Sequence, residues 1–484
     1  MNSIQTKPKL RLLVAIASYG ESHLDYLKQV IEIYHKLPIE VDIVVLSEAP
    51  KNVGDGARVV VGLPSKNPWS LPFAHKKIFA EEAGNYDLFI YTEDDISFTE
   101  QSLDAFLRVT PELAADELAG FLLYEKDQAG KVSLANFHAH FHWKPESAKR
   151  RGRHLIAEFT NEHSAFYLLT QGQLRRAIAS GGFLRGPYEG RYDLLCTAAT
   201  DPYTSCGFRK VICISEPDGF LLHHLPNRYV GKVGIPLEEF QRQVQALARI
   251  ESGSLPAATL CPVETKLRHA LWSKSYYEKP DEPLWKLVPP EAKTVLSVGC
   301  GWGATELILK QRGTGITALP LDSVIGASAA SQGIEIVNGT LQAAIKTLAN
   351  RTFDCVFISG LLHLLPDPWE ALEQCLPLVN DDGTIVIAGP NFERLPVLVK
   401  RLLGSGEYGK LRSFSESGIR PCGRAAVARQ LGKLGWEISA SLWFERTPHL
   451  GEARDFSTGM RRRLGALLAR DWVIQARRRG RRNG

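Results

Sequence analysis

The chain has 484 residues, of which 44% are hydrophobic and 23% are charged, and its formal net charge is +5. This length favours two domains over one, and the ordinary composition excludes a mainly disordered or fibrous protein. No apolar run reaches the roughly 18 residues that a membrane-spanning helix needs. The eight cysteines are scattered without metal-binding spacing, which favours a reducing compartment. We therefore expect a soluble, cytoplasmic protein.

The end of the chain is basic. From Gly451 onward there are ten arginines and three acidic residues, and we assign 479–484 as a basic tail. Such a tail can contact anionic lipid headgroups at the inner face of a membrane. A solvated terminus is the alternative that we favour, because no aromatic residues interleave the final arginines as stacking platforms for nucleic acid would.

The first half of the chain alternates between strand and helix patterns. Apolar strands are expected at Arg11–Ala17, 41–46, 58–61 and 86–91, and apolar periodicity predicts helices over 23–35 and 74–83. Alternation of this kind is typical of a mainly parallel sheet with flanking helices. We therefore predict an α/β domain over 8–250.

A second domain follows a change in composition. Residues 251–291 are rich in proline and in small or charged residues, which indicates a linker, with a possible short helix over Glu264–Ser273. Strand and helix alternation restarts at Lys293 and continues to an expected last strand at Asp471–Ala476. We predict a second α/β domain over 292–478.

An apolar strand of the second domain runs into a glycine-rich turn and then a helix. The stretch VLSVGCGWG contains Gly299, Gly301 and Gly303, which allow a tight turn and a close approach to a nucleotide. It resembles the first motif of class I S-adenosylmethionine-dependent methyltransferases. The segments 353–368 and 376–387 are similar to that family's fourth strand and to the turn before its fifth. The resemblance implies a Rossmann-like fold that binds S-adenosylmethionine through the three glycines.

The sequence departs from the family at both positions where an acid usually contacts the cofactor. Pro320 stands at the ribose position, and Thr340 stands where an acid near adenine is common. Asp322, two residues beyond Pro320, is our candidate cofactor-binding acid. His363 is a candidate general base, because imidazole titrates near neutral pH, with local packing as the equal alternative. We interpret Asp354 as structural.

The fourth strand of the first domain ends in three carboxylates, Glu93, Asp94 and Asp95. Acids at the carboxyl edge of an α/β sheet lie where such sheets bind ligands, and they suit a hard divalent cation that neutralises a diphosphate. The segment resembles the D-x-D region of GT-A glycosyltransferases. The alternative is an acidic loop that precedes a helix capped by Thr99.

That resemblance implies a set of site residues. It implies Mn²⁺ or Mg²⁺ bound by Asp94, Asp95 and a late histidine, His224, although the neighbouring His223 is an equal possibility. It implies contacts to a nucleotide sugar from the first loop and the strand ends, at Ser18, Tyr19, Glu48 and Glu93.

A transferase would also need a base or an acceptor-positioning acid. Asp193 is our first candidate and Asp201 our second, in a segment that also holds Glu189, and each could instead be an ordinary surface or capping acid. The alternating histidines 138, 140 and 142 could bind metal or acceptor, but a half-exposed strand is the interpretation that we favour.

The leading hypothesis is a bifunctional carbohydrate-modifying enzyme. The first domain would transfer a sugar from a nucleotide donor to a glycan or glycolipid acceptor, and the second would methylate a glycan hydroxyl. One alternative is a glycosyltransferase with a degenerate methyltransferase-like scaffold, suggested by Pro320 and Thr340. A second alternative, a nucleic-acid methyltransferase with a basic tail, leaves the acidic edge unexplained.

Overall fold

The computed structural model describes residues 9–446, 453–455 and 466–479. The chain folds into two units, unit 1 with Met1–Phe137 and Phe141–Phe240, and unit 2 with His138–His140 and Gln241–Gly484. No helix within the described ranges is long and apolar enough to cross a membrane. The arginines at 461–463 and 481–482, and all but the first residue of the predicted basic tail, lie outside the described residues.

The main sheet of unit 1 has five strands in the order β11-β4-β1-β2-β3. Strands β1 to β4 run parallel and β11 is antiparallel to β4. Their bounds are β1 Arg11–Ala17, β2 Glu40–Ser47, β3 Ala57–Val61, β4 Leu88–Glu93 and β11 Phe166–Thr170. The four predicted strands and the mainly parallel sheet are confirmed.

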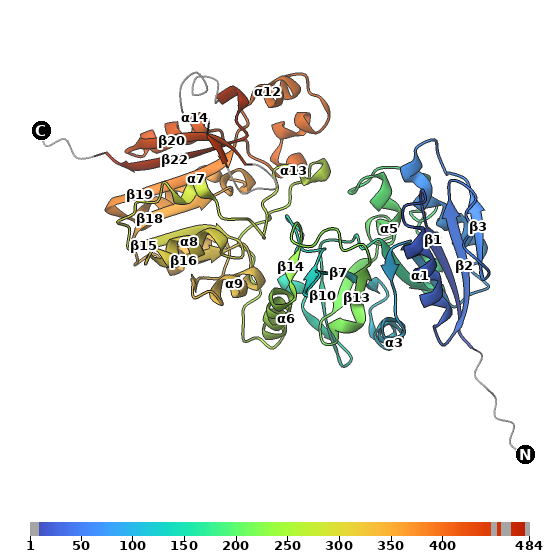
Figure 1. The fold of residues 1–484 in the computed structure, drawn as a ribbon. Helices are drawn as coiled ribbons and strands as arrows, with labels where there is room; N and C mark the ends of the chain where they lie inside the picture. Colours follow the sequence, from blue (N-terminus) through green and yellow to red (C-terminus); the bar gives the residue numbers. More distant parts are fainter. Residues whose placement is uncertain (1–8, 447–452, 456–465, 480–484) are drawn as a thin grey trace, which may run out of the picture. The chain divides into compact units, whose positions relative to one another are not determined.

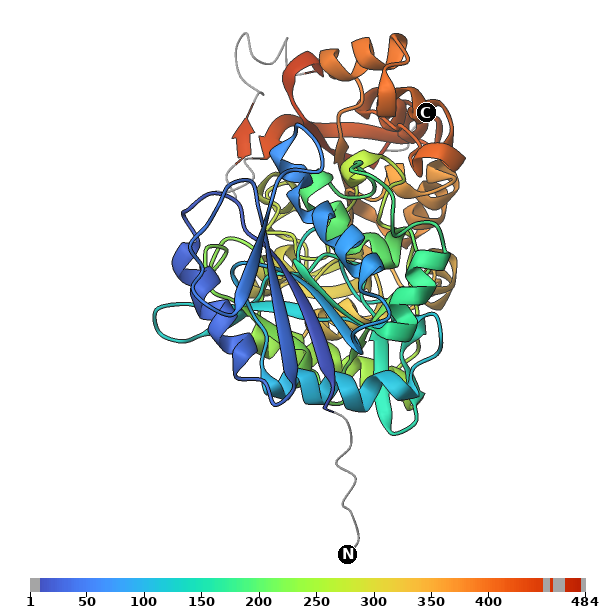
Figure 2. The ribbon, with the colours of Figure 1, turned by 90° about the vertical axis from the view of Figure 1, so that its right-hand side faces the viewer.

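Helices cover both faces of this sheet (Figures 1 and 2). Successive side chains of a strand point to opposite faces, so Leu12, Val14 and Ile16 join one core and Leu13 and Ala15 join the other. The first core includes side chains of α1 Leu24–His35 and α3 Glu100–Val109, and the second includes those of α2 His75–Glu81 and α4 Gln171–Ala179. The helices predicted over 23–35 and 74–83 correspond to α1 and α2.

Two smaller sheets complete unit 1. In the first, β13 Leu221–His224 lies between β7 Leu122–Lys126 and the short strand β5 Ile96–Ser97, beyond which β8 Val132–Leu134 and β14 Ile235–Pro236 follow β7. Because β5 starts directly after the acidic triplet and His224 pairs with Ile96, this sheet brings the late histidine to the end of β4. The second sheet has the order β6-β12-β10-β9, with β6 Glu117–Ala119, β12 Arg209–Cys213, β10 His154–Glu158 and β9 Lys149–Arg151.

A buried carboxylate ties the second small sheet together. Glu117 on β6 is 1% exposed and accepts hydrogen bonds from Arg151 at 2.8 and 2.9 Å, while Lys149 Nζ lies 2.7 Å away. Burial alone would raise the pKa of Glu117, but the bonds from Arg151, Lys149 and the Ala114 amide outweigh burial and hold the pKa at about 2. The folded protein therefore stabilises the ionised form of the Glu117 side chain.

Replacing Glu117 by Gln should lower the free energy of unfolding of unit 1 at pH 7 by about 1–3 kcal/mol, because Arg151 and Lys149, whose side chains are 30% and 32% exposed, lose the counter-charge of a buried carboxylate. The folded pKa of about 2 lies below the ordinary value of 4.5, so the contribution of Glu117 is present above pH 4.5 and is lost as the pH falls toward 2. Urea unfolding at several pH values should show wild type and variant converging in acid. A constant difference at every pH would contradict this assignment.

Unit 2 contains an eight-stranded sheet in the order β17-β16-β15-β18-β19-β22-β20-β21. Its first five strands are parallel, and β22 is antiparallel to both of its neighbours. The strands are β15 Thr294–Cys300, β16 Gly315–Pro320, β17 Glu335–Ile336, β18 Phe353–Ser359, β19 Val379–Pro390, β20 Trp436–Arg446, β21 Ala453–Asp455 and β22 Asp471–Arg478. The predicted second α/β sheet, with a last strand from Asp471, is confirmed.

Helices follow most strands of this sheet and pack on its two faces. On β15, Leu296 and Val298 join one core, whereas Val295 joins the other. The helices are α8 Ala304–Gln311, α9 Ser323–Ala330, α10 Leu341–Thr347, α11 Pro368–Cys375, α12 Leu395–Leu402 and α14 Arg424–Lys433. The glycine-rich turn lies between β15 and α8, at the carboxyl edge of the parallel strands.

The helix predicted over Glu264–Ser273 is wrong. The segment forms only a short 3₁₀ turn, Arg268–Ala270, and His269, Ala270 and Trp272 have positive φ angles. The Thr265 hydroxyl donates to the Leu271 carbonyl, and the Thr265 amide donates to the Ser273 hydroxyl. These local bonds compete with helical hydrogen bonding. The segment therefore forms a loop within unit 2.

Candidate functional site

The acidic triplet lies at the carboxyl end of β4, next to the end of β1. Strand β4 ends at Glu93, and Asp94 and Asp95 form the turn that follows, where they are 6% and 4% exposed. The apolar residues of β4 pack on both faces of the sheet, so the strand holds these acids inside the protein. The structure therefore places the three carboxylates where the sequence predicts a ligand-binding edge.

Two histidines lie against these carboxylates. His23 Nδ1 is 3.1 Å from Asp94 Oδ1 and 3.4 Å from Asp95 Oδ2, and His224 Nε2 is 3.3 Å from Asp95 Oδ2. Ligand atoms of His23, Asp94 and Asp95 lie within 4.8 Å of one another. Oxygen and imidazole ligands at such distances can close around one divalent cation after small side-chain shifts.

The two late histidines differ in their surroundings. His224 Nδ1 lies 2.6 Å from Glu125 Oε1, which leaves Nε2 facing Asp95. His223 instead stacks on Tyr124 and bonds to Asn227. The structure thus brings His224, and not His223, to the acidic edge, with a carboxylate that orients its ring as the partners of metal-bound histidines do.

Burial and mutual repulsion disfavour the ionised forms of the carboxyl groups at this edge. Burial raises the pKa of Glu93 to about 8, with further increases from Asp95 and Asp94, and burial also raises the pKa of Asp94. The Oδ1 atom of Asp95 is buried and has no hydrogen-bond partner. A carboxylate oxygen in that position is the kind of group that a bound cation satisfies.

The loops after β1 and β2 carry the predicted nucleotide-binding residues Ser18, Tyr19 and Glu48. Ser18 is buried, Tyr19 is 56% exposed, and Glu48 Oε1 accepts the Gly20 amide at 2.9 Å. Lys51, which sequence reasoning missed, donates to the Ser18 carbonyl at 2.7 Å and to its hydroxyl at 2.8 Å. Because Ser18 hydrogen-bonds to Asp94 and Asp94 acts on Lys51, these two loops lie beside the acidic edge.

The two candidate bases differ in environment. Asp193 is the N-cap of α5 Leu194–Thr204, where it accepts the Cys196 amide at 2.9 Å, and it is close enough to contribute to the raised pKa of Glu93. Asp201 is fully buried, pairs with Lys76 and accepts the Tyr188 hydroxyl at 2.6 Å. Both oxygens of Asp201 are thus used in contacts within the core, which favours a structural role, and its catalytic role stays a prediction.

Sequence reasoning missed His23 and Glu125 as well as Lys51. His23 lies four residues beyond Tyr19, directly before α1, and a histidine between the predicted nucleotide-binding loop and a helix is the signal that could have identified it. Glu125 gives no such signal, because only the pairing of β7 with β13 brings it to His224.

The predicted histidine strand does not form. Residues 136–142 have no regular strand, and Ala139 has a positive φ angle. Among the described residues, no group of potential metal ligands contains His138, His140 or His142. Thr99 does cap α3, as the alternative for the acidic loop predicted, but α3 starts five residues beyond Asp95.

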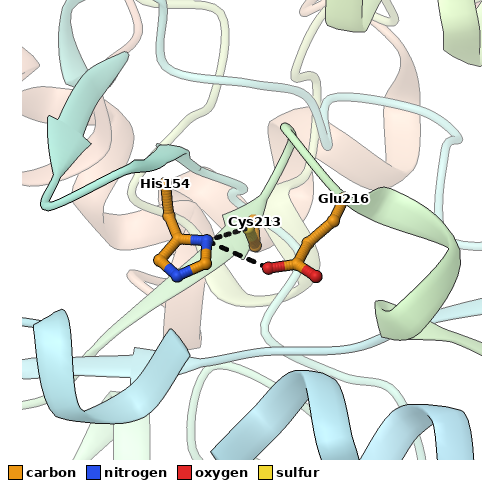
Figure 3. Close-up of side chains that lie close together, drawn as sticks. All are labelled: His154, Cys213 and Glu216. Carbon is orange, nitrogen blue, oxygen red and sulfur yellow. Dashed lines mark hydrogen bonds and ion pairs between the residues drawn. The ribbon is translucent and has the colours of Figure 1, made fainter. Parts of the chain in front are cut away.

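A second group of potential metal ligands lies on the small sheet of β6, β12, β10 and β9. His154 Nδ1 is 2.9 Å from Glu216 Oε1 and 4.0 Å from Cys213 Sγ (Figure 3). Arg108 donates to the other Glu216 oxygen at 2.8 Å, and burial raises the pKa of the Cys213 thiol. The two oxygens of Glu216 are therefore already used, one by His154 and the other by Arg108.

Changing Asp201 to Ala should cost about 3–5 kcal/mol of folding stability, because it leaves the buried Lys76 ammonium without a counter-charge. The double variant Lys76→Met/Asp201→Leu should recover most of that loss. Chemical denaturation of the three proteins measures both effects. A stable Asp201→Ala protein that has lost enzymatic activity would instead favour the catalytic role of Asp201.

The glycine-rich turn of unit 2 has the backbone that its sequence predicts. Gly299 and Gly303 have φ angles of 88° and 91°, a region that favours glycine. A small cavity lies against the turn, and its wall includes Glu278, the three glycines, Glu306 and Ser359. The turn thus lines a cavity at the carboxyl edge of the sheet.

Gly301 is needed for a contact within the chain. A Cβ atom on Gly301 would lie 2.4 Å from the Tyr276 carbonyl oxygen, and the Trp302 amide donates to that same oxygen at 3.0 Å. The backbone of the segment before β15 therefore packs directly against the turn. The middle glycine, predicted to admit a nucleotide, admits the backbone of Tyr276.

The same segment also covers the end of β16. Leu260 donates its amide to the Leu321 carbonyl at 2.9 Å, and Thr259 forms a bridge with Asp322. Asp322 is 2% exposed, and its Oδ1 accepts the amides of Val324 and Ile325 as the cap of α9. Sequence reasoning missed this capping role, and the prediction that Asp322 binds the cofactor remains a prediction.

A buried lysine of this segment lies at the end of β18. Lys274 Nζ donates to the Ser359 carbonyl at 2.8 Å and to Glu278 Oε2 at 2.9 Å, and its side chain is 1% exposed. Because Glu278 and Ser359 also line the cavity, the ammonium contacts two residues of the cavity wall.

Comparison with known proteins identifies unit 2. Residues 296–387 match the family model described as a methyltransferase domain. This part of the chain is therefore similar to methyltransferase domains. The protein is therefore a transferase, and S-adenosylmethionine is the methyl donor of the solved methyltransferases that it resembles. The family match does not reach unit 1, and no curated protein sequence matches the chain.

Several solved structures are similar in fold to the methyltransferase domain. A methyltransferase from Thermotoga maritima, described as a possible histamine N-methyltransferase, is 16% identical, with 41% of this chain and 87% of that chain covered and a TM-score of 0.30. One from Archaeoglobus fulgidus is 20% identical, with 40% and 88% covered and a TM-score of 0.29. Magnesium protoporphyrin IX methyltransferase from Synechocystis PCC 6803 is 14% identical, with 38% and 74% covered and a TM-score of 0.27.

His363 lies in a 3₁₀ turn after β18 of the methyltransferase domain. Its side chain is buried, and Nε2 lies 2.8 Å from the Trp272 carbonyl, so Nε2 carries a proton and donates it. Burial lowers the pKa of His363 to about 4, which makes it a weak base at neutral pH. The geometry fits the packing alternative better than the predicted general base. Asp354, interpreted as structural, accepts the amides of Lys293 and Thr294.

Proposed function

We propose that unit 1 transfers a glycosyl group from a nucleotide sugar with the help of Mn²⁺ or Mg²⁺. The observation that carries this proposal is the convergence of Asp94, Asp95, His23 and His224 at the carboxyl end of β4. The unpartnered oxygen of Asp95 and the parallel sheet behind it support a cation that faces a ligand. This edge also lies beside Ser18, in the loop after β1, and Lys51, in the loop after β2, which contact each other.

Each residue of the edge has a distinct task in this proposal. Asp94, Asp95 and His224 would hold the cation, with His23 as a further ligand, and the cation would neutralise the donor diphosphate. Lys51 is placed to add positive charge near the phosphates, and Tyr19, which is exposed, offers a ring to the nucleotide. Asp193 is the acid that remains available to position an acceptor hydroxyl.

Metal binding tests this assignment. The chain should bind Mn²⁺, and Asp95→Asn and His224→Gln should each weaken binding by about 10-fold or more. His223→Gln is the matched control, because it removes the neighbouring imidazole that stacks on Tyr124. Calorimetry with Mn²⁺, followed by a screen for metal-dependent hydrolysis of nucleotide sugars, provides the readouts. Equal losses in both histidine variants would contradict the site.

We infer that unit 2 methylates a hydroxyl group on a glycan or glycolipid. Its methyltransferase domain supports methyl transfer, and fusion to a sugar-handling unit favours a carbohydrate acceptor. Gly299 and Gly303 supply a turn that can cradle S-adenosylmethionine, which would donate the methyl group. The chain's own part is to hold that turn open and to exclude water with the segment before β15.

A scaffold role for unit 2 is the second candidate, and a specific observation favours it. Tyr276 and Lys274 already occupy the glycine turn and the end of β18, and Asp322 is used as a helix cap. In this alternative the segment fills the site permanently and only unit 1 is active.

Calorimetry of the full chain with S-adenosylmethionine and S-adenosylhomocysteine separates the two candidates. An active site should bind either ligand with a micromolar dissociation constant, and Gly301→Ala should abolish binding, because a Cβ atom there displaces the Tyr276 backbone. Gly432→Ala is the matched control, since a Cβ atom at Gly432 meets nothing within 4 Å. No binding at millimolar ligand would support the scaffold.

A further inference from the structure

Helix α12 of unit 2 presents an apolar stripe to the outside. Leu395 is 51%, Val399 45%, Leu402 80% and Leu403, directly after the helix, 76% exposed. These positions recur at intervals of three and four residues, so they lie on one face of the helix. Val397, on the opposite face, is buried against Leu411 and Ile419. The helix thus has one apolar face for its core and a second one without a described covering.

Neighbouring leucines extend the stripe. Asn391, just before α12, donates to the carbonyls of Ala466 and Ala469 at 2.8 and 2.9 Å. These two bonds hold residues 466–469 beside the start of the helix, where Leu467 is 39% and Leu468 is 46% exposed. We call Leu395, Val399, Leu402, Leu403, Leu467 and Leu468 the α12 patch.

Cations flank the α12 patch, and acids are absent from the helix. Residues 394–403 contain Arg394, Lys400 and Arg401 but no Asp or Glu. Helical geometry puts Lys400 on one side of the stripe and the two arginines on the other. Long basic side chains in such positions can reach outward while the leucines between them leave water.

We propose that the α12 patch docks unit 2 on the surface of an anionic lipid bilayer. An exposed apolar stripe with cations on both flanks is the arrangement that places a helix in the plane of a membrane interface. The leucines would enter the boundary between headgroups and acyl chains, and Lys400, Arg394 and Arg401 would contact lipid phosphates. A second protein copy fits less well, because two copies would bring the cations of the two helices together.

Vesicle flotation with the full chain tests this proposal. The protein should bind vesicles of phosphatidylcholine with about one third phosphatidylglycerol, bind vesicles of phosphatidylcholine alone far less, and lose binding as salt is added. Leu402→Ser/Leu403→Ser should weaken binding to anionic vesicles at least about tenfold, because two apolar anchors are lost while every charge is kept. Lys400→Glu/Arg401→Glu should weaken it by a similar factor.

Leu184→Ser is the matched control, because Leu184 in unit 1 is a leucine with 52% exposure outside the α12 patch. Thermal unfolding verifies that each variant is folded, and light scattering after gel filtration gives its oligomeric state. Binding by wild type and Leu402→Ser/Leu403→Ser to the same extent would overturn the proposal. So would no binding by wild type, or a wild-type dimer that the leucine substitutions convert to a monomer.

Discussion

Three carboxylates in a row at the end of a buried strand are the constraint on which unit 1 depends. Taking ionised carboxylates out of water costs several kcal/mol each unless cations or hydrogen bonds compensate. The surroundings supply His23, His224 and Lys51, and Arg228 acts on Glu93 from farther away. That supply is insufficient, since the pKa of Glu93 still rises to about 8. Glu93 therefore keeps its proton near neutral pH. A further cation at this edge would be electrostatically favourable, because it would stabilise the ionised carboxylates.

The candidate site of unit 2 is shaped by backbone atoms, whereas that of unit 1 depends on charged side chains. Its turn depends on glycines that leave space, and the segment before β15 takes part of that space through Tyr276 and Lys274. The segment also contributes Glu278 to the cavity wall. The same contacts are therefore compatible with two alternatives. Either the segment closes a water-free binding pocket, or it occupies the pocket itself, and the two differ in whether a ligand can displace Tyr276 and Lys274.

The positions of the strands could be predicted from the sequence, because short alternating or continuous apolar runs are compatible with few other secondary structures. The pattern of β1 and the glycine turn after β15 located the two carboxyl edges. The partners at these edges could not be predicted in the same way. Glu125 reaches His224 only through the pairing of β7 with β13, and Asp201 reaches Lys76 through the packing of α5 on α2. A carboxylate in the sequence does not reveal whether its counter-charge comes from the core or from a ligand.

Charge balance separates the two clusters of potential metal ligands. In the group of His154, Cys213 and Glu216, an imidazole and a thiol whose pKa is raised by burial accompany one carboxylate, and Arg108 pairs with that carboxylate. A cation that entered there would have to displace a proton from the thiol and would meet the guanidinium. At the end of β4, Asp94 and Asp95 face histidines, Glu93 adds a third carboxyl group, and one Asp95 oxygen has no partner. A divalent cation would relieve repulsion at that edge and create repulsion at the other cluster, so the acidic edge is the site that a metal ion would select.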